Sequence, residues 1–237
     1  MSESAVFTTS LVELKGGGGA GAGGARGEAK VKIRQVASEE FGCFIWPSAV
    51  LLSQYLFEHS GVVRNSKVLE LGAGVGLPGL LCRKLGASRV LLTDLSKPPI
   101  ILSNLQHNCC ANELEHCSAA PMDWGIVTEE MLLMRRTCYD VLLAADCLYS
   151  SSLYEDFLCT ASFFLRPAPK GEAGASSVKA PARPRLFTVF QERGSGFSLA
   201  RLMGRWGLRY AKIDFVPSCS ALVGSCREEA GEEVTIC

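Results

Sequence analysis

The sequence has no excess of either charge: Lys plus Arg and Asp plus Glu each number 24, and the formal net charge is zero. A nucleic-acid-binding protein typically carries a basic excess, so we expect no direct nucleic-acid partner. No apolar run reaches the ~18 residues that a membrane span needs, so we expect no membrane association. The first ten residues, MSESAVFTTS, do not combine a basic segment with an apolar one, so we expect no secretory signal.

Paired metal-ligand and hydrolase motifs are also missing. The 11 cysteines include no C-x-x-C, and spread-out cysteines without a signal are typical of reduced thiols in a cytoplasmic or nuclear protein. Histidine and cysteine crowd together only at 107–117, where adjacent Cys109 and Cys110 cannot comfortably face one tetrahedral ion from a helix. We therefore expect no metal. With three histidines and no G-x-S-x-G, a Ser-His-Asp hydrolase has little support.

The 237 residues fit one large domain, and 48% of them are hydrophobic. Apolar patterning after residue 40 predicts strands at 67–71, 89–93, 117–121, 139–145, 186–190, 208–216 and 233–237. It predicts helices at 49–57, 77–85, 99–112, 153–165 and 199–206. This alternation indicates an α/β fold with a mostly parallel sheet of seven strands and helices on both faces. The last strand must run antiparallel, because no helix separates it from the preceding strand.

The N-terminal region has a different composition. Two strand-like pieces, Val6–Leu14 and Lys30–Val36, flank Gly16–Gly27, which holds eight of the 24 glycines. This insert has no apolar side chain larger than alanine, so we expect a flexible loop. We divide the chain into N-terminal strands with this loop (1–40) and a main domain (41–237). A second flexible loop is expected at Ala168–Pro184.

The strand at 67–71 runs into a glycine-rich turn and then a helix. Gly72, Gly74 and Gly76 let the backbone approach a ligand, and Asp94 ends the next strand about 20 residues later, where an acid binds ribose hydroxyls. A dinucleotide site usually has a third glycine where Leu77 stands. A Glu70 carboxylate pointing into the loop would repel a pyrophosphate and suit the cationic S-adenosylmethionine (SAM). SAM is therefore favoured over a dinucleotide, and either over a purely structural turn.

Two further places carry candidate side chains. Asp123 and Trp124 follow the third predicted strand of the main domain and could contact an adenine, by accepting from its amine and covering its ring; alternatively they are a turn residue and a core residue. Asp146 ends the next strand and could orient an amine or guanidinium. The alternative for Asp146 is a helix N-cap, for which Ser150–Ser152 are better placed.

Four motifs in order resemble the seven-β-strand protein methyltransferases of family 16, the methyltransferase-like 21/22/23 group. They are Phe44–Ala49 (FIWPSA), Val68–Gly79 (VLELGAGVGLPG), Asp123–Gly125 (DWG) and Asp146–Tyr149 (DCLY). The resemblance runs from about Val31 onward. Leu77–Gly79, Gln191 with Arg193, and Ser198–Leu199 before Trp206 look most like the methyltransferase-like protein 23 branch.

The resemblance implies a Rossmann-like methyltransferase fold that uses SAM. Glu70, Gly72, Gly74 and Gly76 match the methionine-contacting loop, Asp94 the ribose acid, Asp123 and Trp124 the adenine contacts, and Trp46 a tryptophan over the cofactor. Asp146 and Tyr149 match a D-x-x-Y element beside the transferred methyl. That branch tends not to keep the tyrosine, so the acceptor, arginine or lysine, stays open. Neither expected loop belongs to the shared pattern.

The resemblance implies a protein substrate of the histone, chaperone or translation-factor class, and we expect a monomer. Three alternatives stay open. A small-molecule methyltransferase usually covers its pocket with added N-terminal helices, whereas strands are predicted here. A SAM-binding interaction module would grip a chaperone or nuclear partner without methylating it. A dehydrogenase would bind NAD in place of SAM.

Overall fold

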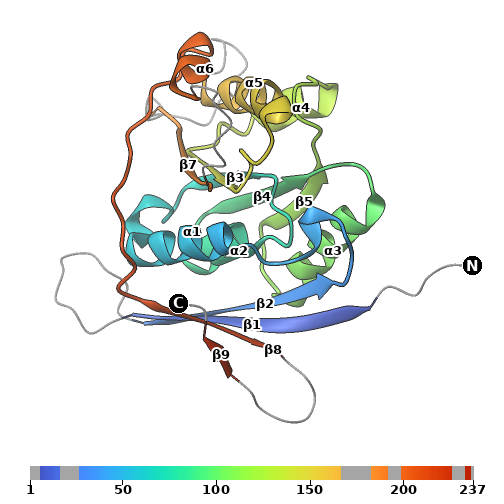
Figure 1. The fold of residues 1–237 in the computed structure, drawn as a ribbon, viewed down its shortest axis with the longest axis vertical. Coiled ribbons are helices and arrows are strands. Elements are labelled where there is room, and N and C mark those ends of the chain that lie inside the picture. The colour runs from blue at the N-terminus through green and yellow to red at the C-terminus, as the bar shows by residue number, and fades with distance from the viewer. Residues whose placement is uncertain (1–5, 17–26, 167–182, 192–198, 226–232, 236–237) are drawn as a thin grey trace, which may run out of the picture.

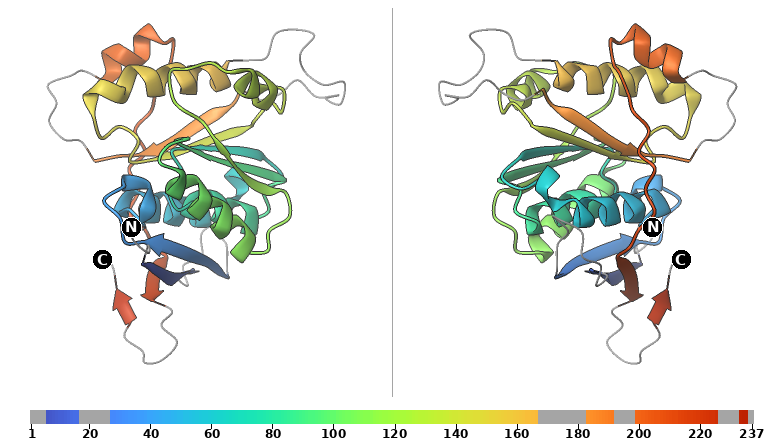
Figure 2. Two further views of the ribbon diagram at one scale, coloured as in Figure 1. Left: turned by 90° about the vertical axis from the view of Figure 1, so that its right-hand side faces the viewer. Right: turned by 90° about the vertical axis from the view of Figure 1, so that its left-hand side faces the viewer.

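The computed structural model describes residues 6–16, 27–166, 183–191, 199–225 and 233–235. These residues form four layers (Figure 1). Helices α4 (Glu129–Arg135), α5 (Tyr154–Leu165) and α6 (Leu199–Arg205) cover one face of a central sheet. Helices α1 (Pro47–Glu58), α2 (Leu77–Lys84) and α3 (Pro99–Ala111) cover the other face, and a second sheet packs on the far side of α1–α3. Figure 2 shows the same layering from two other sides. Most of the Gly16–Gly27 insert and of the Ala168–Pro184 loop lies outside the described residues.

The central sheet is the predicted parallel sheet. It consists of β3 (Lys67–Leu71), β4 (Arg89–Asp94), β5 (Cys117–Pro121), β6 (Val141–Ala145) and β7 (Arg185–Val189). The order is β5-β4-β3-β6-β7, and each neighbouring pair is parallel. The α/β class is therefore confirmed. Strand order reverses between β3 and β6, and the crevice at the carboxyl ends of such strands is where open α/β sheets bind ligands.

All but one of the helices in the described residues are those that the apolar periodicity predicts. The helices are α1 (Pro47–Glu58), α2 (Leu77–Lys84), α3 (Pro99–Ala111), α4 (Glu129–Arg135), α5 (Tyr154–Leu165) and α6 (Leu199–Arg205), with short 3₁₀ turns η1 (Phe41–Cys43), η2 (Ser60–Val62) and η3 (Ser151–Leu153). The sequence analysis missed α4. Its N-terminal signal is Thr128, whose hydroxyl accepts a hydrogen bond from the Met131 amide at 3.2 Å. In the described part of the chain, no helix combines the length and apolar character that crossing a membrane requires.

The second sheet is antiparallel and joins the two ends of the chain. Its strands are β1 (Phe7–Lys15), β2 (Glu28–Val36), β8 (Ser220–Ser225) and β9 (Glu233–Thr235), in the order β2-β1-β8-β9. β9 runs antiparallel to its neighbour, as predicted for the last strand, but the neighbour is β8 in this second sheet. The sequence analysis predicts one sheet. In the structure the central strands form one sheet and the terminal strands form another.

The strand predicted at 208–216 is wrong. This segment is extended but belongs to no strand, and it runs past the edge of the central sheet on its way to β8 (Figure 1). Its apolar side chains are mostly in solvent, with Tyr210 65%, Ile213 51% and Val216 88% exposed. The local apolar pattern suits a strand, but strand formation also needs a neighbouring backbone to pair with, and β8 pairs instead with β1.

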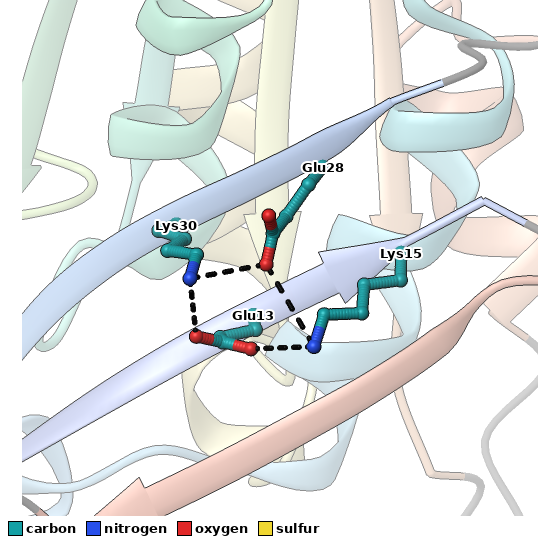
Figure 3. A network of polar contacts seen from close by, with 4 residues as sticks. All are labelled: Glu13, Lys15, Glu28 and Lys30. Atoms are coloured by element: carbon teal, nitrogen blue, oxygen red, sulfur yellow. Dashed lines mark ion pairs between the residues drawn. The ribbon is translucent and has the colours of Figure 1, made fainter.

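The N-terminal strands share the main core. Val12 and Leu14 of β1 and Val31 and Ile33 of β2 are fully buried in one cluster with Leu80 of α2. The outer face of the same strands carries a square of ion pairs among Glu13, Lys15, Glu28 and Lys30, at 2.8–3.7 Å (Figure 3). Solvent screens exposed pairs of this kind, so they contribute little to stability. The inner, apolar face therefore holds β1 and β2 to the helices across the boundary expected at residue 40.

Three buried asparagines, two on α3 and one directly after its last residue, bind the open edge of β2. Asn112 bonds both backbone groups of Lys32 (3.0 and 2.7 Å), and Asn108 bonds both of Arg34 (2.8 and 3.1 Å). Asn104 accepts from the Arg34 guanidinium at 2.8 Å. Asn108 also donates to the Val75 carbonyl at 3.0 Å, which lies in the glycine turn after β3. These amides satisfy edge-strand groups that would otherwise be buried without partners, and they tie β2 to the glycine turn.

Candidate active site

The glycine turn, residues 72–76, crosses the carboxyl end of the central sheet. Gly72 and Gly76 have φ of +62° and +86°, backbone angles that residues with a Cβ rarely adopt. A Cβ added at Gly72 would lie 2.8 Å from both Cys147 Sγ and Trp124 Cζ2. The loops after β3, β5 and β6 therefore meet at Gly72. The structure brings together segments that the sequence separates by about 50 and 75 positions.

Asp94, at the end of β4, holds this turn from the side. Its carboxylate is 8% exposed and accepts from the Gly74 amide at 2.6 Å and the Leu95 amide at 2.7 Å. Burial raises the pKa of Asp94, and the two backbone hydrogen bonds oppose that rise. Asp94 therefore anchors the glycine turn, and each of its oxygens keeps a further lone pair for another donor.

Asp123 and Trp124 lie beside Asp94 in the loop after β5. Asp123 accepts from the Ser96 amide (3.1 Å) and the Ser96 hydroxyl (2.7 Å), so this loop is bound to the one after β4. Trp124 is half-buried and packs edge-on against Phe157 of α5, with ring centroids 5.2 Å apart. Trp124 therefore contacts the core, as the alternative interpretation has it, and also lies against the glycine turn; the adenine contact stays a prediction.

Glu70 is placed differently from the sequence-based interpretation. Its carboxylate is buried, and Oε2 accepts from the Gly79 amide in the first turn of α2 at 2.9 Å. A Cβ at Gly79 would lie 2.5 Å from this oxygen, so glycine there admits the carboxylate. Burial raises the pKa of Glu70 to about 8. The side chain therefore supports the start of α2 and is largely uncharged at neutral pH, so the repulsion of a pyrophosphate argued from its charge does not hold.

The raised pKa makes a prediction about stability. Between the ordinary pKa of 4.5 and about 8, folded Glu70 holds a proton that the unfolded chain has released, so the stability it contributes is lost as pH rises through this window. The slope is at most about 1.4 kcal/mol per pH unit. Glu70→Gln cannot ionise, and its amide oxygen can still accept from Gly79. We expect urea unfolding to show a shallower pH dependence for the variant; equal slopes for the two proteins would contradict this.

Asp146 and Tyr149 follow β6 on the other side of the glycine turn. Asp146 has φ of +54°, and its amide donates to the Val189 carbonyl of β7 at 2.7 Å. Its Oδ1 accepts from the Gln191 amide at 3.4 Å. Cys147 is buried beneath, and its thiol donates to the Leu71 carbonyl at 3.1 Å. This packing fixes the start of the loop, so Asp146 lies at the same sheet edge as Asp94 and Gly72.

Trp46 lies in an aromatic cluster rather than alone. Its indole N–H donates to the Phe41 carbonyl at 2.7 Å, and its ring lies 4.7 Å from Phe44 and 6.1 Å from Phe41, measured between centroids. Phe41 in turn contacts Tyr149, 5.5 Å away. The sequence analysis missed Phe41 and also Leu95, an apolar residue 43% exposed directly after Asp94. The available signal was an apolar residue near a predicted site residue: Leu95 directly follows Asp94, and Phe41 lies five positions before Trp46.

The side chains around the turn fit SAM, the cofactor that the resemblance implies. Ribose hydroxyls and the adenine amine donate hydrogen bonds, and the carboxylates of Asp94 and Asp123 can accept them. Leu95, directly after Asp94, offers an exposed apolar surface suited to the face of a base. Within the described residues, no three His, Cys, Asp or Glu side chains gather as a metal site would require.

Comparisons with known proteins give a consistent result. A family model described as lysine methyltransferase matches residues 25–169. A Xenopus laevis protein named histone-arginine methyltransferase METTL23 is 31% identical over 184 residues, which cover 78% of this chain and 72% of that protein. Its Homo sapiens namesake is 32% identical, covering 72% and 81%. The Mus musculus protein-lysine methyltransferase METTL21E is 35% identical over 126 residues, covering 51% and 50%. The matching relatives are thus named for two different acceptor residues.

Proposed function

Because this chain belongs to the lysine methyltransferase family whose model it matches, family 16, it is a SAM-dependent protein methyltransferase, and we propose that it methylates an arginine or lysine side chain. The observation that carries the proposal is the convergence of the glycine turn, Asp94 and Asp146 at one sheet edge. We further propose a substrate of the histone, chaperone or translation-factor class, a cytoplasmic or nuclear location and a monomeric enzyme. The names of the relatives support both acceptors and, for two of them, histones.

We assign the cofactor contacts from this geometry. The backbone of Gly72, Gly74 and Gly76 would border the methionine part, and Asp94 would accept from the ribose. Asp123 and Trp124 would accept from and cover the adenine, and Trp46 would lie above the cofactor near the acceptor. Glu70 would support the cofactor site indirectly, because its hydrogen bond to the start of α2 holds the glycine turn in place.

We assign the transfer step to the edge between the glycine turn and Asp146. SAM supplies a methyl group on a positively charged sulfur. The attacking nitrogen needs a free electron pair, so a lysine ammonium would first release a proton to water. The new N–C bond would form as the C–S bond breaks, with the electron pair of that bond staying on sulfur; an arginine nitrogen would release its proton to water after the transfer. In-line displacement depends chiefly on alignment. The Asp146 carboxylate would orient the nitrogen and stabilise its developing positive charge, and Tyr149 would line the same place.

The test is transfer of labelled methyl from SAM to cell-extract proteins and to purified core histones, followed by hydrolysis to amino acids. We expect label in methyl-arginine or methyl-lysine, and the labelled amino acid identifies the acceptor. Calorimetry with SAM and with NAD runs in parallel, and we expect binding of SAM only. SAM binding without any protein label would contradict the proposal and favour a small-molecule substrate or an interaction module. Binding of NAD in place of SAM would favour a dehydrogenase.

A further inference from the structure

The aromatic cluster beside Asp146 includes one exposed ring, that of Phe41, whose exposure the packing of the fold does not explain. Phe41 is 60% exposed, yet it contacts the rings of Tyr149 (5.5 Å) and Trp46 (6.1 Å). Scattered single apolar residues on a surface need no explanation. Here, however, the three rings come from separate segments, before α1 and after β6, and they meet beside the proposed transfer site.

The 3₁₀ turn that carries Phe41 is fixed on the glycine turn. Cys43 is fully buried against Ile101, and a Cβ added at Gly42 would lie 2.7 Å from Ile101 Cγ2, so the turn sits flush on α3. A Cβ added at Gly74 would lie 3.5 Å from the Gly42 carbonyl oxygen, so the two turns are neighbours. With its carbonyl held by the Trp46 indole, Phe41 is presented by a rigid backbone.

Among the described residues, carboxylates lie close enough to these rings to act on them. Asp94 is close enough to act on Tyr149, whose pKa is raised by burial first and then by neighbouring charges including that of Asp94. Burial raises the pKa of Cys147, beneath the loop that carries Tyr149, and Asp94 and Asp146 raise it further. Aromatic faces combined with nearby carboxylates attract a cation.

We propose that Phe41 and Tyr149 form the entrance that receives the positively charged side chain of the protein substrate, with Phe41 as a substrate-binding residue. The inference rests on the proposed function and adds to it: the arginine or lysine passes along the ring of Phe41 before its nitrogen reaches Asp146. The exposed ring would hold the cationic end group during approach and the apolar stem afterwards. A neutral side chain of the same length would gain only the second contact.

The first test compares Phe41→Leu, which keeps an apolar side chain but removes the π face, with Phe41→Tyr, which keeps the ring. For the protein acceptor identified by labelling, we expect KM to rise about 10-fold in Phe41→Leu and to stay within about twofold in Phe41→Tyr. The kcat and the affinity for SAM should stay within about twofold in both. The control is Tyr210→Leu, which removes an aromatic ring, 65% exposed, from the segment after α6. An unchanged KM in Phe41→Leu, or a loss of SAM affinity instead, would overturn the inference.

A second test does not depend on turnover. The protein is saturated with S-adenosylhomocysteine, and binding of acetyl-arginine methylamide, acetyl-lysine methylamide and the neutral acetyl-citrulline methylamide is followed by ligand NMR. We expect the wild type to prefer the cationic ligands and Phe41→Leu to lose that preference. A wild type that does not distinguish charge would refute the entrance. If no protein is labelled but the charge preference depends on Phe41, the proposed function fails and the cation site stands.

Discussion

Asp146→Asn is expected to lower kcat by about 100-fold or more while the dissociation constant for SAM changes less than threefold. Asparagine is the informative replacement because Asp146 has φ of +54°, which asparagine tolerates and alanine does not. The backbone bond to Val189 should therefore survive, and only the charge is removed. An amide cannot stabilise positive charge on the acceptor nitrogen as a carboxylate does. The measurement is the initial rate of labelled methyl transfer at saturating SAM, with calorimetry for SAM binding.

A matched control lies next to the other end of the same strand. Asp140 precedes β6 and accepts from the Lys67 amide at 2.8 Å, on the amino side of the sheet. Asp140→Asn keeps an oxygen for that bond and should leave kcat within about twofold. If Asp146→Asn transfers methyl at the wild-type rate, Asp146 has no role at the acceptor nitrogen. Equal losses in both variants would instead point to damage to β6.

Gly72→Ala is expected to weaken SAM binding by about 10-fold or more and to lower the free energy of unfolding by about 3 kcal/mol. Two effects add. Alanine at φ of +62° is strained, and its Cβ would lie 2.8 Å from Cys147 Sγ and from Trp124 Cζ2, so one of the three loops must move. Where the loop of Trp124 moves, it displaces the residue assigned to the adenine, and a shift of the glycine turn changes the backbone assigned to the methionine part. Calorimetric titration with SAM and urea unfolding measure the two losses.

Gly207→Ala separates strain from crowding. Gly207 has φ of +69°, but a Cβ there would meet no atom within 4 Å. We expect this variant to lose only about 1 kcal/mol of stability and to bind SAM as the wild type does. If Gly72→Ala loses no more than Gly207→Ala, the meeting of the three loops at Gly72 is not what restricts position 72. The double variant Gly72→Ala/Cys147→Ala should recover part of the loss, because it removes one of the two contacts.

The central sheet was predictable because its signals are local. β3, β4, β6 and β7 are short, largely apolar runs, each followed by a predicted helix, and the glycines of the turn directly follow β3. The resemblance to family 16 and its methyltransferase-like protein 23 branch is confirmed by the family match and the relatives. The prediction of a strand at 208–216 was wrong for the opposite reason. Its alternation of side chains is a local signal, but a strand also needs a neighbouring strand to pair with, and distant parts of the chain decide that.

The candidate site also has some residues that the sequence identifies and others that it does not. Asp94 and Asp146 were identifiable because an acid at the carboxyl end of a parallel strand must lie at the ligand-binding edge, whatever the remainder of the chain does. The direction in which the Glu70 side chain points was not identifiable from the sequence, because it depends on the space that the missing Cβ of Gly79 leaves beside α2. The asparagines of α3 were also missed, although their spacing of four residues is a helical signal. Their partners include the backbone groups of a strand 70 to 80 positions away.

The order of residues thus determined the fold class, the family and the acids at the sheet edge, because these follow from short-range periodicity and from the direction of parallel strands. Tertiary contacts decided which strands close the second sheet, that Glu70 supports a helix, and that Phe41 stands exposed beside Tyr149. The physical reason is that pairing, burial and ring contact depend on atoms brought close in space, and residues far apart in the sequence supply them.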